Sequence, residues 1–273
     1  MKEITYSLVQ SAAEGDHAAL DQIILKLQPS MYNLSLRMLW HPEDAQDATQ
    51  EILIRIVTRL GSFRGESSFT TWAYRVAKNH LINTKKSRVE LANYTFVKFE
   101  EELDDSSQER EFIATSQQEL SYLISEVKIG CTLAMLSCLD RESRLIYILG
   151  EIFELNSTDG SEIMECSPDV FRKRLSRSRT SIEDFSRRKC GVVNPENRCR
   201  CSKKISPAIN SGLVDPNHLL FVEPTTISDA ELSHTIDQLE KDRELVAIYR
   251  NHPQFRSQKN FKDAIKRLIF KSH

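Results

Sequence analysis

The sequence predicts an all-α protein made of two small helical domains, an acidic linker between them and a C-terminal extension. The chain has 273 residues, enough for about two domains at roughly 100–200 residues each. It holds only 8 glycines and 8 prolines, too few for the many turns of an all-β sandwich. Apolar residues recur every three to four positions, the spacing of a buried helix face. We place the first domain at 1–90, the linker at 91–118, the second domain at 119–190 and the extension at 191–273.

The first domain is predicted to be a series of amphipathic helices. One helix is expected over 17–40, interrupted near Pro29 because proline lacks a backbone donor and clashes with the preceding turn. The next is expected over 42–60, with Pro42 near its start and acidic residues in its first turn. A third should begin near Phe69.

In the linker the helical periodicity fades and acidic residues dominate. Residues 99–111 contain seven Asp and Glu and one Arg, a local charge of −6. Such a composition favours a solvated segment over a packed one. We therefore expect a mobile tether between the two domains.

The second domain ends in a pattern typical of a helix-turn-helix. Two helices are expected over 157–165 and 168–189, separated only by the turn Cys166–Ser167. Residues 171–204 hold 12 Lys and Arg against three acids, a local charge of +9. Two helices joined by a tight turn, the second of them basic, indicate a motif that binds a polyanion such as DNA.

The C-terminal extension begins with turn-forming residues and ends in two expected helices, 228–249 and 258–270. A Cys-x8-Cys-x-Cys cluster marks its start, formed by Cys190, Cys199 and Cys201. Disulfides are not expected in a cytoplasmic chain, so a metal site, a redox switch and plain reduced thiols remain open. Zinc would need a fourth ligand, for which the candidates are Cys166, His218 and His252. Two further cysteines, Cys131 and Cys138, are expected in the core.

Several classes of protein are excluded by what the sequence lacks. It has no run of 18 apolar residues and a polar N-terminus, so we expect a cytoplasmic protein without membrane insertion or a secretory signal. It has no HExxH, Walker or GxSxG motif, and its seven histidines are scattered. We therefore expect no enzyme.

Two blocks of the sequence resemble a known family. Residues 41–88, HPEDAQDATQEILIRIVTRLGSFRGESSFTTWAYRVAKNHLINTKKSR, resemble the promoter-melting domain of bacterial sigma factors of the extracytoplasmic-function (ECF) group. Residues 139–182, which contain the predicted helix-turn-helix, are similar to the −35-binding domain of that group. With flanking helices the resemblance covers about two thirds of the chain. It implies a sigma factor that binds core RNA polymerase and directs promoter-specific transcription initiation.

One stripe of the helix expected over 42–60 is a candidate polymerase-binding surface. It consists of Asp47, Gln50, Glu51 and Ile54. Two acids and an amide beside an apolar residue suit a protein–protein contact better than DNA. The resemblance implies that this stripe docks on the clamp-helix coiled coil of core RNA polymerase.

The segment 61–86 is the candidate for opening the −10 element. Opening a duplex requires cations for phosphates and side chains that accept an unstacked base. The resemblance places Asn79 where the family reads a flipped base. The full −10 set is Arg64, Ser67, Arg75, Lys78, Asn79 and Asn83, with Arg75, Lys78 and Asn83 expected on the solvent face. Phe69 and Trp72 are expected in the core.

The start of the helix expected over 168–189 is the candidate reader of the −35 element. Base edges in the major groove should be contacted by Ser167, Asp169, Phe171, Arg172 and Ser176. Phosphates should be contacted by Lys173, Arg174, Arg177 and Arg179. Val170, Leu175 and Ile182 are expected to pack.

One position departs from the family pattern. Gly160 lies in the first helix of the motif, where the family has a bulky apolar residue. Glycine in a helix costs about 0.5–1 kcal/mol relative to alanine, and here it should also leave core volume empty. We therefore expect altered geometry or strength of −35 binding.

An alternative is a stand-alone helix-turn-helix regulator that responds to metal or redox state through Cys190, Cys199 and Cys201. It would leave the block 41–86 without a purpose. The extension resembles, in position and size only, the C-terminal tails that regulate some sigma factors in place of an anti-sigma factor. The acidic linker would either lie in the RNA exit channel or serve as a solvated tether.

Overall fold

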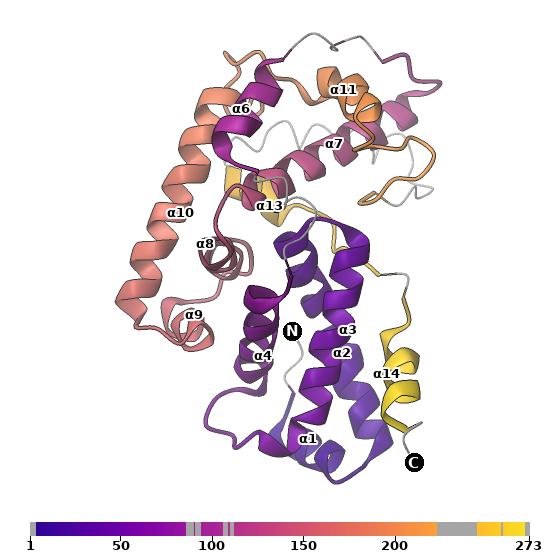
Figure 1. Ribbon diagram of the computed structural model, residues 1–273, viewed down its shortest axis with the longest axis vertical. Helices are drawn as coiled ribbons and strands as arrows, with labels where there is room; N and C mark the ends of the chain where they lie inside the picture. Colours follow the sequence, from indigo (N-terminus) through magenta and orange to yellow (C-terminus); the bar gives the residue numbers. More distant parts are fainter. Residues whose placement is uncertain are drawn as a thin grey trace.

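The computed structural model describes residues 4–85, 90, 94–105, 109, 112–222, 245–257 and 259–270, and the regular structure in these ranges is entirely helical (Figure 1). This confirms the all-α prediction. The first module contains α1 (Tyr6–Ala13), α2 (His17–Leu39), α3 (Pro42–Thr58) and α4 (Phe69–Asn83). The second contains α7 (Gln117–Ser137), α8 (Arg141–Tyr147), the π-helical turn η2 (Ile148–Ile152), α9 (Ser157–Met164) and α10 (Pro168–Lys189).

The first module is a bundle in which local signals set the helix ends and apolar stripes form the core. The Asp16 carboxylate accepts a hydrogen bond from the Ala18 amide at 2.8 Å and caps α2. The Ser68 hydroxyl does the same for α4 through the amide of Thr71 at 3.0 Å. Ile23 of α2 and Ile52 of α3 are fully buried between the helices.

The predicted break at Pro29 is wrong, because α2 continues through it. A proline at this position deprives the carbonyl of Leu25, four residues earlier, of its helical donor. Leu25 has a side chain that is 55% exposed, so it lies on the solvent side of the helix, where water can serve that carbonyl.

The second module contains the helix-turn-helix that the sequence predicts. Helix α9 ends at Met164, and the capping residue Glu165 adopts the left-handed conformation with φ 54° and ψ 44°. The Ser167 hydroxyl then accepts a hydrogen bond from the Val170 amide at 3.3 Å and begins α10. Helix α7, at the other end of the module, is long and apolar enough to span a membrane by composition, but 67% of its most apolar window is buried inside the protein.

Part of the predicted tether is a docked helix, α6 (Phe96–Asp104). The ring of Phe99 stacks on that of Phe185 from α10, with centroids 5.2 Å apart. On the neighbouring face, the Glu100 carboxylate lies 2.9 Å from the Lys189 ammonium. The expectation of a mobile segment is therefore wrong for these residues: the acidic charge of α6 is matched by the basic end of α10.

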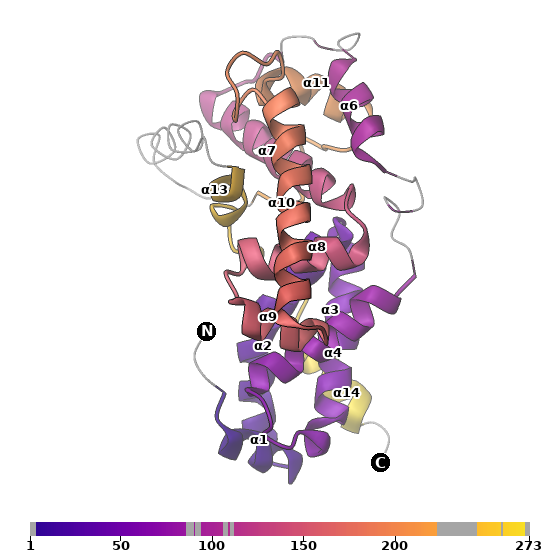
Figure 2. The ribbon, with the colours of Figure 1, turned by 90° about the vertical axis from the view of Figure 1, so that its left-hand side faces the viewer.

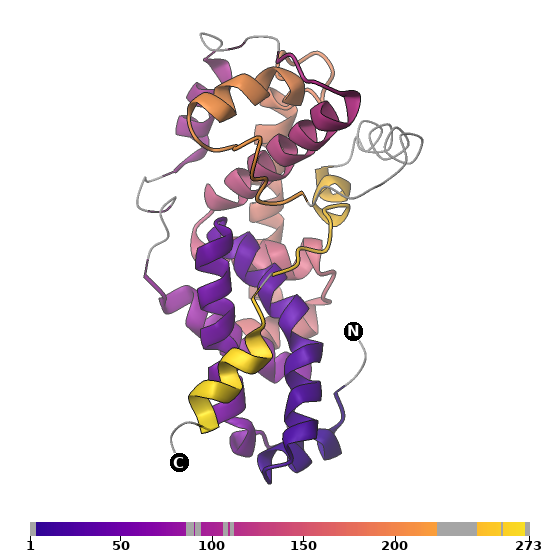
Figure 3. The same cartoon turned by 90° about the vertical axis from the view of Figure 1, so that its right-hand side faces the viewer.

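In the described part of the extension, short helical segments lie on both modules: η3 (Cys201–Lys204), α11 (Ile205–Asn210), α13 (Leu245–Arg250) and α14 (Phe261–Phe270). The helix predicted over 228–249 falls largely outside the described residues, and α13 is its last part. The helix predicted over 258–270 is present and starts at Phe261. Figure 3 shows α13 beside the second module and α14 beside the first, joined by an extended segment.

Candidate nucleic-acid interface

The first turns of α10 present a dense group of polar and charged side chains to solvent. Eight of the nine residues predicted to contact the −35 element are exposed there: Ser167, Asp169, Arg172, Lys173, Arg174, Ser176, Arg177 and Arg179. Because α10 follows a tight turn and stands along one side of the molecule (Figure 2), its start is placed as in a recognition helix.

Phe171 is the exception, and its predicted contact with a base is wrong. Its side chain is fully buried, and it belongs to a stripe that continues through Leu175, Ser178, Ile182 and Phe185. That spacing of four, three, four and three residues marks one helix face, so the sequence contained the signal.

The ring of Phe171 fills the space above Gly160. A Cβ atom on Gly160 would lie only 2.4 Å from Cζ of that ring, so the expected loss of core volume at this position does not occur. Val170, predicted to pack, is 39% exposed instead. The register of α10 therefore buries Phe171 and exposes Val170, the reverse of what the sequence predicts.

Three arginines on the exposed side of α10 are held by carboxylates of the same module. Arg172 pairs with Asp169, Arg174 with Glu142, and Arg179 with Glu151. The side chains of these arginines are 55%, 44% and 44% exposed, respectively. These cations can therefore reach phosphates by exchanging one anionic partner for another.

In the first module, the predicted −10 residues divide into two groups. Arg64, Asn79 and Asn83 are exposed, and Ser67 is half-buried. The Asn83 side-chain amide donates to the Asn79 carbonyl at 2.8 Å. The rings of Phe63, Phe69 and Trp72 pack together at the start of α4, and Phe69 and Trp72 join the core as predicted.

Arg75 and Lys78 form the second group. The predicted place on the solvent face is wrong for Lys78, which is buried, while Arg75 is half-buried. The Arg75 guanidinium donates to Glu162 at 3.0 Å, and the Lys78 ammonium contacts the Glu165 carboxylate. Lys78 is only 9% exposed, because α4 packs against α9. Two cations three positions apart on α4 thus pair with two acids three positions apart at the end of α9. The sequence of either module alone does not predict this pairing.

The predicted polymerase-binding stripe lies on α3. Its members follow one another at intervals of three, one and three residues, which places them on one helix face. Asp47 and Glu51 are exposed, while Gln50 and Ile54 are half-buried. The Asp47 carboxylate is 3.2 Å from the ammonium of Lys259 in the extension.

Two arginines that the sequence analysis did not single out connect the modules. Arg141 donates to the carbonyls of Ile82 at 2.9 Å and Thr84 at 2.6 Å, at the end of α4. It also pairs with Glu90 at 2.7 Å, and Arg144, only 2% exposed, shares that carboxylate at 3.3 Å. Burial lowers the pKa of Arg144, and the Glu90 charge opposes this shift.

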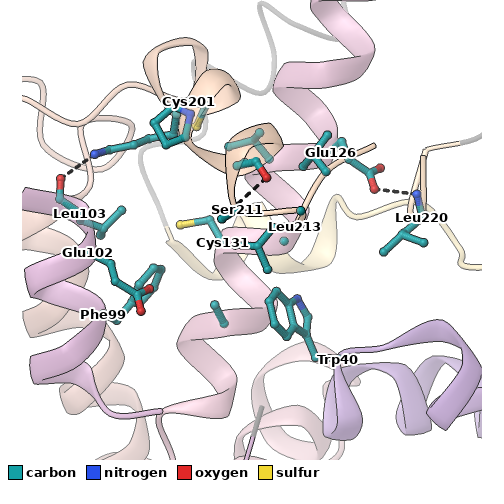
Figure 4. Close-up of a pocket in the computed structure, with 18 of the residues that line it drawn as sticks. Trp40, Phe99, Glu102, Leu103, Glu126, Cys131, Cys201, Ser211, Leu213 and Leu220 are labelled. Atoms are coloured by element: carbon teal, nitrogen blue, oxygen red, sulfur yellow. Dashed lines mark hydrogen bonds between the residues drawn. The ribbon is translucent and has the colours of Figure 1, made fainter. Parts of the chain in front are cut away.

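The predicted cysteine cluster lies beside a cavity of about 540 Å³. Cys199 and Cys201 line it together with Cys131 of α7, and Figure 4 shows Cys131 and Cys201 around it. Burial raises the pKa of Cys131 well above its usual value, and the charges of Cys190, Cys199 and Cys201 raise it further. Within the ranges that the structure describes, no three Cys, His, Asp or Glu side chains are placed to hold a metal ion. Zinc binding stays a prediction.

The exposed basic recognition helix of the second module and the exposed amides on α4 of the first module are the features of a two-module DNA-binding protein. Comparison with known proteins narrows this class. Residues 23–89 match the family model for sigma-70 region 2.

Curated relatives match over a longer part of the chain. The RNA polymerase sigma-H factor of Pseudomonas aeruginosa is 30% identical in an alignment of 196 residues that covers 67% of this chain and 93% of the relative. The ECF RNA polymerase sigma-E factors of Haemophilus influenzae and Escherichia coli are 27% and 26% identical, over 65% of this chain and 93% and 91% of their own lengths. The chain belongs to the ECF group of the sigma-70 family, and it functions as an RNA polymerase sigma factor in transcription initiation.

Proposed function

We propose that this sigma factor binds core RNA polymerase through the α3 stripe, reads the −35 element with the start of α10 and opens the −10 element with α4. The observation that carries the proposal is the exposed start of α10, where eight of nine predicted residues face solvent directly after a tight turn. The chain would act in the cytoplasm and contribute binding energy, while the polymerase supplies the catalytic centre.

Asn79 is the residue we propose for capturing an unstacked base of the −10 element. It is exposed, and its backbone is held by the Asn83 amide. Arg64 and Asn83 would hold the displaced strand through its phosphates and sugars. Arg75 and Lys78 can join them only after leaving Glu162 and Glu165, so promoter binding requires α4 and α9 to separate.

The geometry of promoter DNA supports this separation. Two elements centred about 25 base pairs apart lie roughly 85 Å apart along B-form DNA, at about 3.4 Å per pair. Modules whose −10 helix and helix-turn-helix are in direct contact cannot reach both elements at once. The compact arrangement is therefore the one adopted away from the promoter.

A zinc ion would be held by Cys190, Cys199 and Cys201 together with a fourth ligand, for which Cys131 lines the same cavity as Cys199 and Cys201. Metal analysis of the purified protein tests this. An anti-sigma factor would bind the same stripe of α3 or the start of α10. A stand-alone regulator would leave the α3 stripe unused.

The test is transcription in vitro by purified core RNA polymerase, with and without the protein, on sheared genomic DNA. We expect discrete start sites that depend on the protein, with shared −35 and −10 sequences upstream. The variant Gln50→Lys/Glu51→Lys should lose these transcripts and co-elution with core. Gln10→Lys/Glu14→Lys, the same charge change on exposed residues at the other end of the module, should retain both. Unaltered co-elution of the first variant would refute the docking stripe.

A further inference from the structure

We propose that the end of the chain is an inhibitory strap that competes with core RNA polymerase for the α2–α3 surface and holds the two modules closed. The strap is defined as residues 245–257 and 259–266. This inference rests on the proposed function, because it assigns a second occupant to the polymerase-binding face. Three sets of contacts carry it, one on the second module and two on the first.

The first set attaches the strap to the second module. Tyr249 is fully buried, and its hydroxyl donates to the Thr132 carbonyl of α7 at 3.1 Å. Arg250 donates to the Glu151 carbonyl at 2.8 Å and pairs with Glu154 at 2.9 Å. A buried aromatic side chain with a satisfied hydroxyl, flanked by a fork of arginine contacts, is a specific attachment and not a loose surface association.

The second set attaches the strap to α2. The Asn33 side chain donates to the Phe255 carbonyl at 3.0 Å and accepts from the Phe255 amide at 3.3 Å. It therefore binds one strap residue through both of its backbone groups. The Arg37 guanidinium lies 5.0 Å from the centroid of the Phe255 ring, within the range of a cation–π contact. Phe255 is 6% exposed and Arg37 is 5% exposed, so these contacts are shielded from water.

The third set places the strap on the face that the polymerase would use. Helix α14 packs on both α2 and α3, with Phe261 and Ile265 fully buried. Lys259 pairs with Asp47 at 3.2 Å, and Lys266 pairs with Asp21 of α2 at 2.7 Å. Asp47 is one of the four predicted docking residues, so strap and polymerase cannot both contact it through the same carboxylate.

The three sets together couple two effects. Between its attachments at Tyr249 and Phe261 the strap crosses from the second module to the first, as Figure 3 shows, and so favours the arrangement in which α4 meets α9. In that arrangement Arg75 and Lys78 are occupied by Glu162 and Glu165. Removing the strap from α3 should therefore expose the docking stripe and also release the −10 cations.

The first experiment weakens the strap without altering α2 or α3. Lys259→Glu/Lys266→Glu in the full-length chain reverses the two strap charges that pair with acids of α2 and α3. Arg256→Glu/Lys262→Glu is the matched control, since neither of these side chains forms an ion pair within the described part of the structure. Affinity for core polymerase is measured by titration of labelled protein. We expect the first variant to bind roughly three- to tenfold more tightly, because the apparent Kd falls as the competent fraction rises, and the control to match the wild type.

The second experiment needs no variant. Hydrogen exchange of the strap amides is compared between the free protein and its complex with core polymerase. A ten-residue helix detached from its support is unstable in water, so amides of 261–266 should exchange at least tenfold faster in the complex. Unchanged affinity of the first variant together with unchanged protection in the complex would refute the strap and leave the docking stripe intact. If a chain ending before Leu245 also fails to bind core, the proposed function and the strap fall together.

Discussion

The close packing of Gly160 against Phe171 gives the sharpest test of how the helix-turn-helix is built. A Cβ atom on Gly160 would lie 2.4, 2.6 and 2.9 Å from three atoms of the Phe171 ring, and the ring is fully buried and has no open side to move into. Gly160→Leu, which restores the bulky apolar residue typical of the family, should therefore overpack the core. Overpacking costs about 1–3 kcal/mol, while the better helix propensity of leucine returns less than about 1 kcal/mol. We expect a net loss of about 1–2 kcal/mol of unfolding free energy.

The substitution of Phe171, on the other side of this contact, creates a cavity instead. Phe171→Ala should cost about 3–5 kcal/mol, the usual range for a buried phenylalanine. In the double variant, Leu at 160 can occupy the space that the ring vacates. We therefore expect the double variant to be more stable than the sum of the two single effects by at least about 2 kcal/mol.

Urea unfolding followed by circular dichroism measures these free energies. Gly61→Ala is the control, since nothing lies within 4 Å of a Cβ at Gly61 and the change should stay within about 0.5 kcal/mol of the wild type. Strictly additive effects of the two substitutions, or a Gly160→Leu variant as stable as the wild type, would refute the reasoning that the ring replaces the missing side chain.

Three further predictions concern the contacts between modules, the strap and the −10 surface. Glu90→Gln leaves Arg141 and Arg144 without their shared carboxylate, and Arg144 is 2% exposed, so urea unfolding should show a loss of about 3 kcal/mol; a loss below about 0.5 kcal/mol would contradict the network. Burial, with the charges of Arg37 and Lys128, lowers the pKa of His252 from 6.5 to about 3. The neutral side chain therefore supports the fold fully above pH 6.5, and stability falls by about 1.4 kcal/mol per pH unit between pH 6.5 and about 3. Hydrogen exchange of 245–257 at pH 7.5 and 5.5 should show this loosening, and His252→Gln should abolish the pH dependence; the same slope in the variant would assign it to another group. Asn79→Ala should reduce open-complex formation on duplex promoter DNA more than on a pre-melted bubble, and equal losses on both would remove its proposed role.

Features set by neighbouring residues were predictable from the sequence. The helices of the first module and the helix-turn-helix follow from apolar spacing and from caps such as Ser68 and Ser167, whose hydroxyls bind amides three residues away. The family resemblance rests on the same local blocks. These features need only the periodicity of one helix and the chemistry of its first turn.

Features that depend on distant partners were not predictable. Lys78 lies in a segment whose composition suits DNA binding, yet its ammonium meets Glu165, 87 residues further along the chain. Helix α6 is acidic enough to be classed as a tether, yet Glu100 meets Lys189 of α10. In both cases a charged side chain pairs with an opposite charge on a distant element. A single sequence does not reveal which element supplies that partner. Phe171 is different, because the apolar stripe that it forms with Leu175 and Ile182 can be recognised from the sequence. The sequence prediction places Val170 in that stripe instead of Phe171.

The strap belongs to the same chain as the surfaces it covers, and this sets how the sigma factor would respond to its own abundance. A tethered segment experiences its binding surface at an effective concentration that can reach millimolar values, whatever the amount of protein in the cell. A separate inhibitor is outnumbered when synthesis of its target rises, whereas each new molecule of this protein carries its own inhibitory strap. The fraction of sigma factor with a released strap would therefore stay constant as its concentration rises. Activation has to come from a competitor for the α2–α3 surface or from a chemical change in the strap itself.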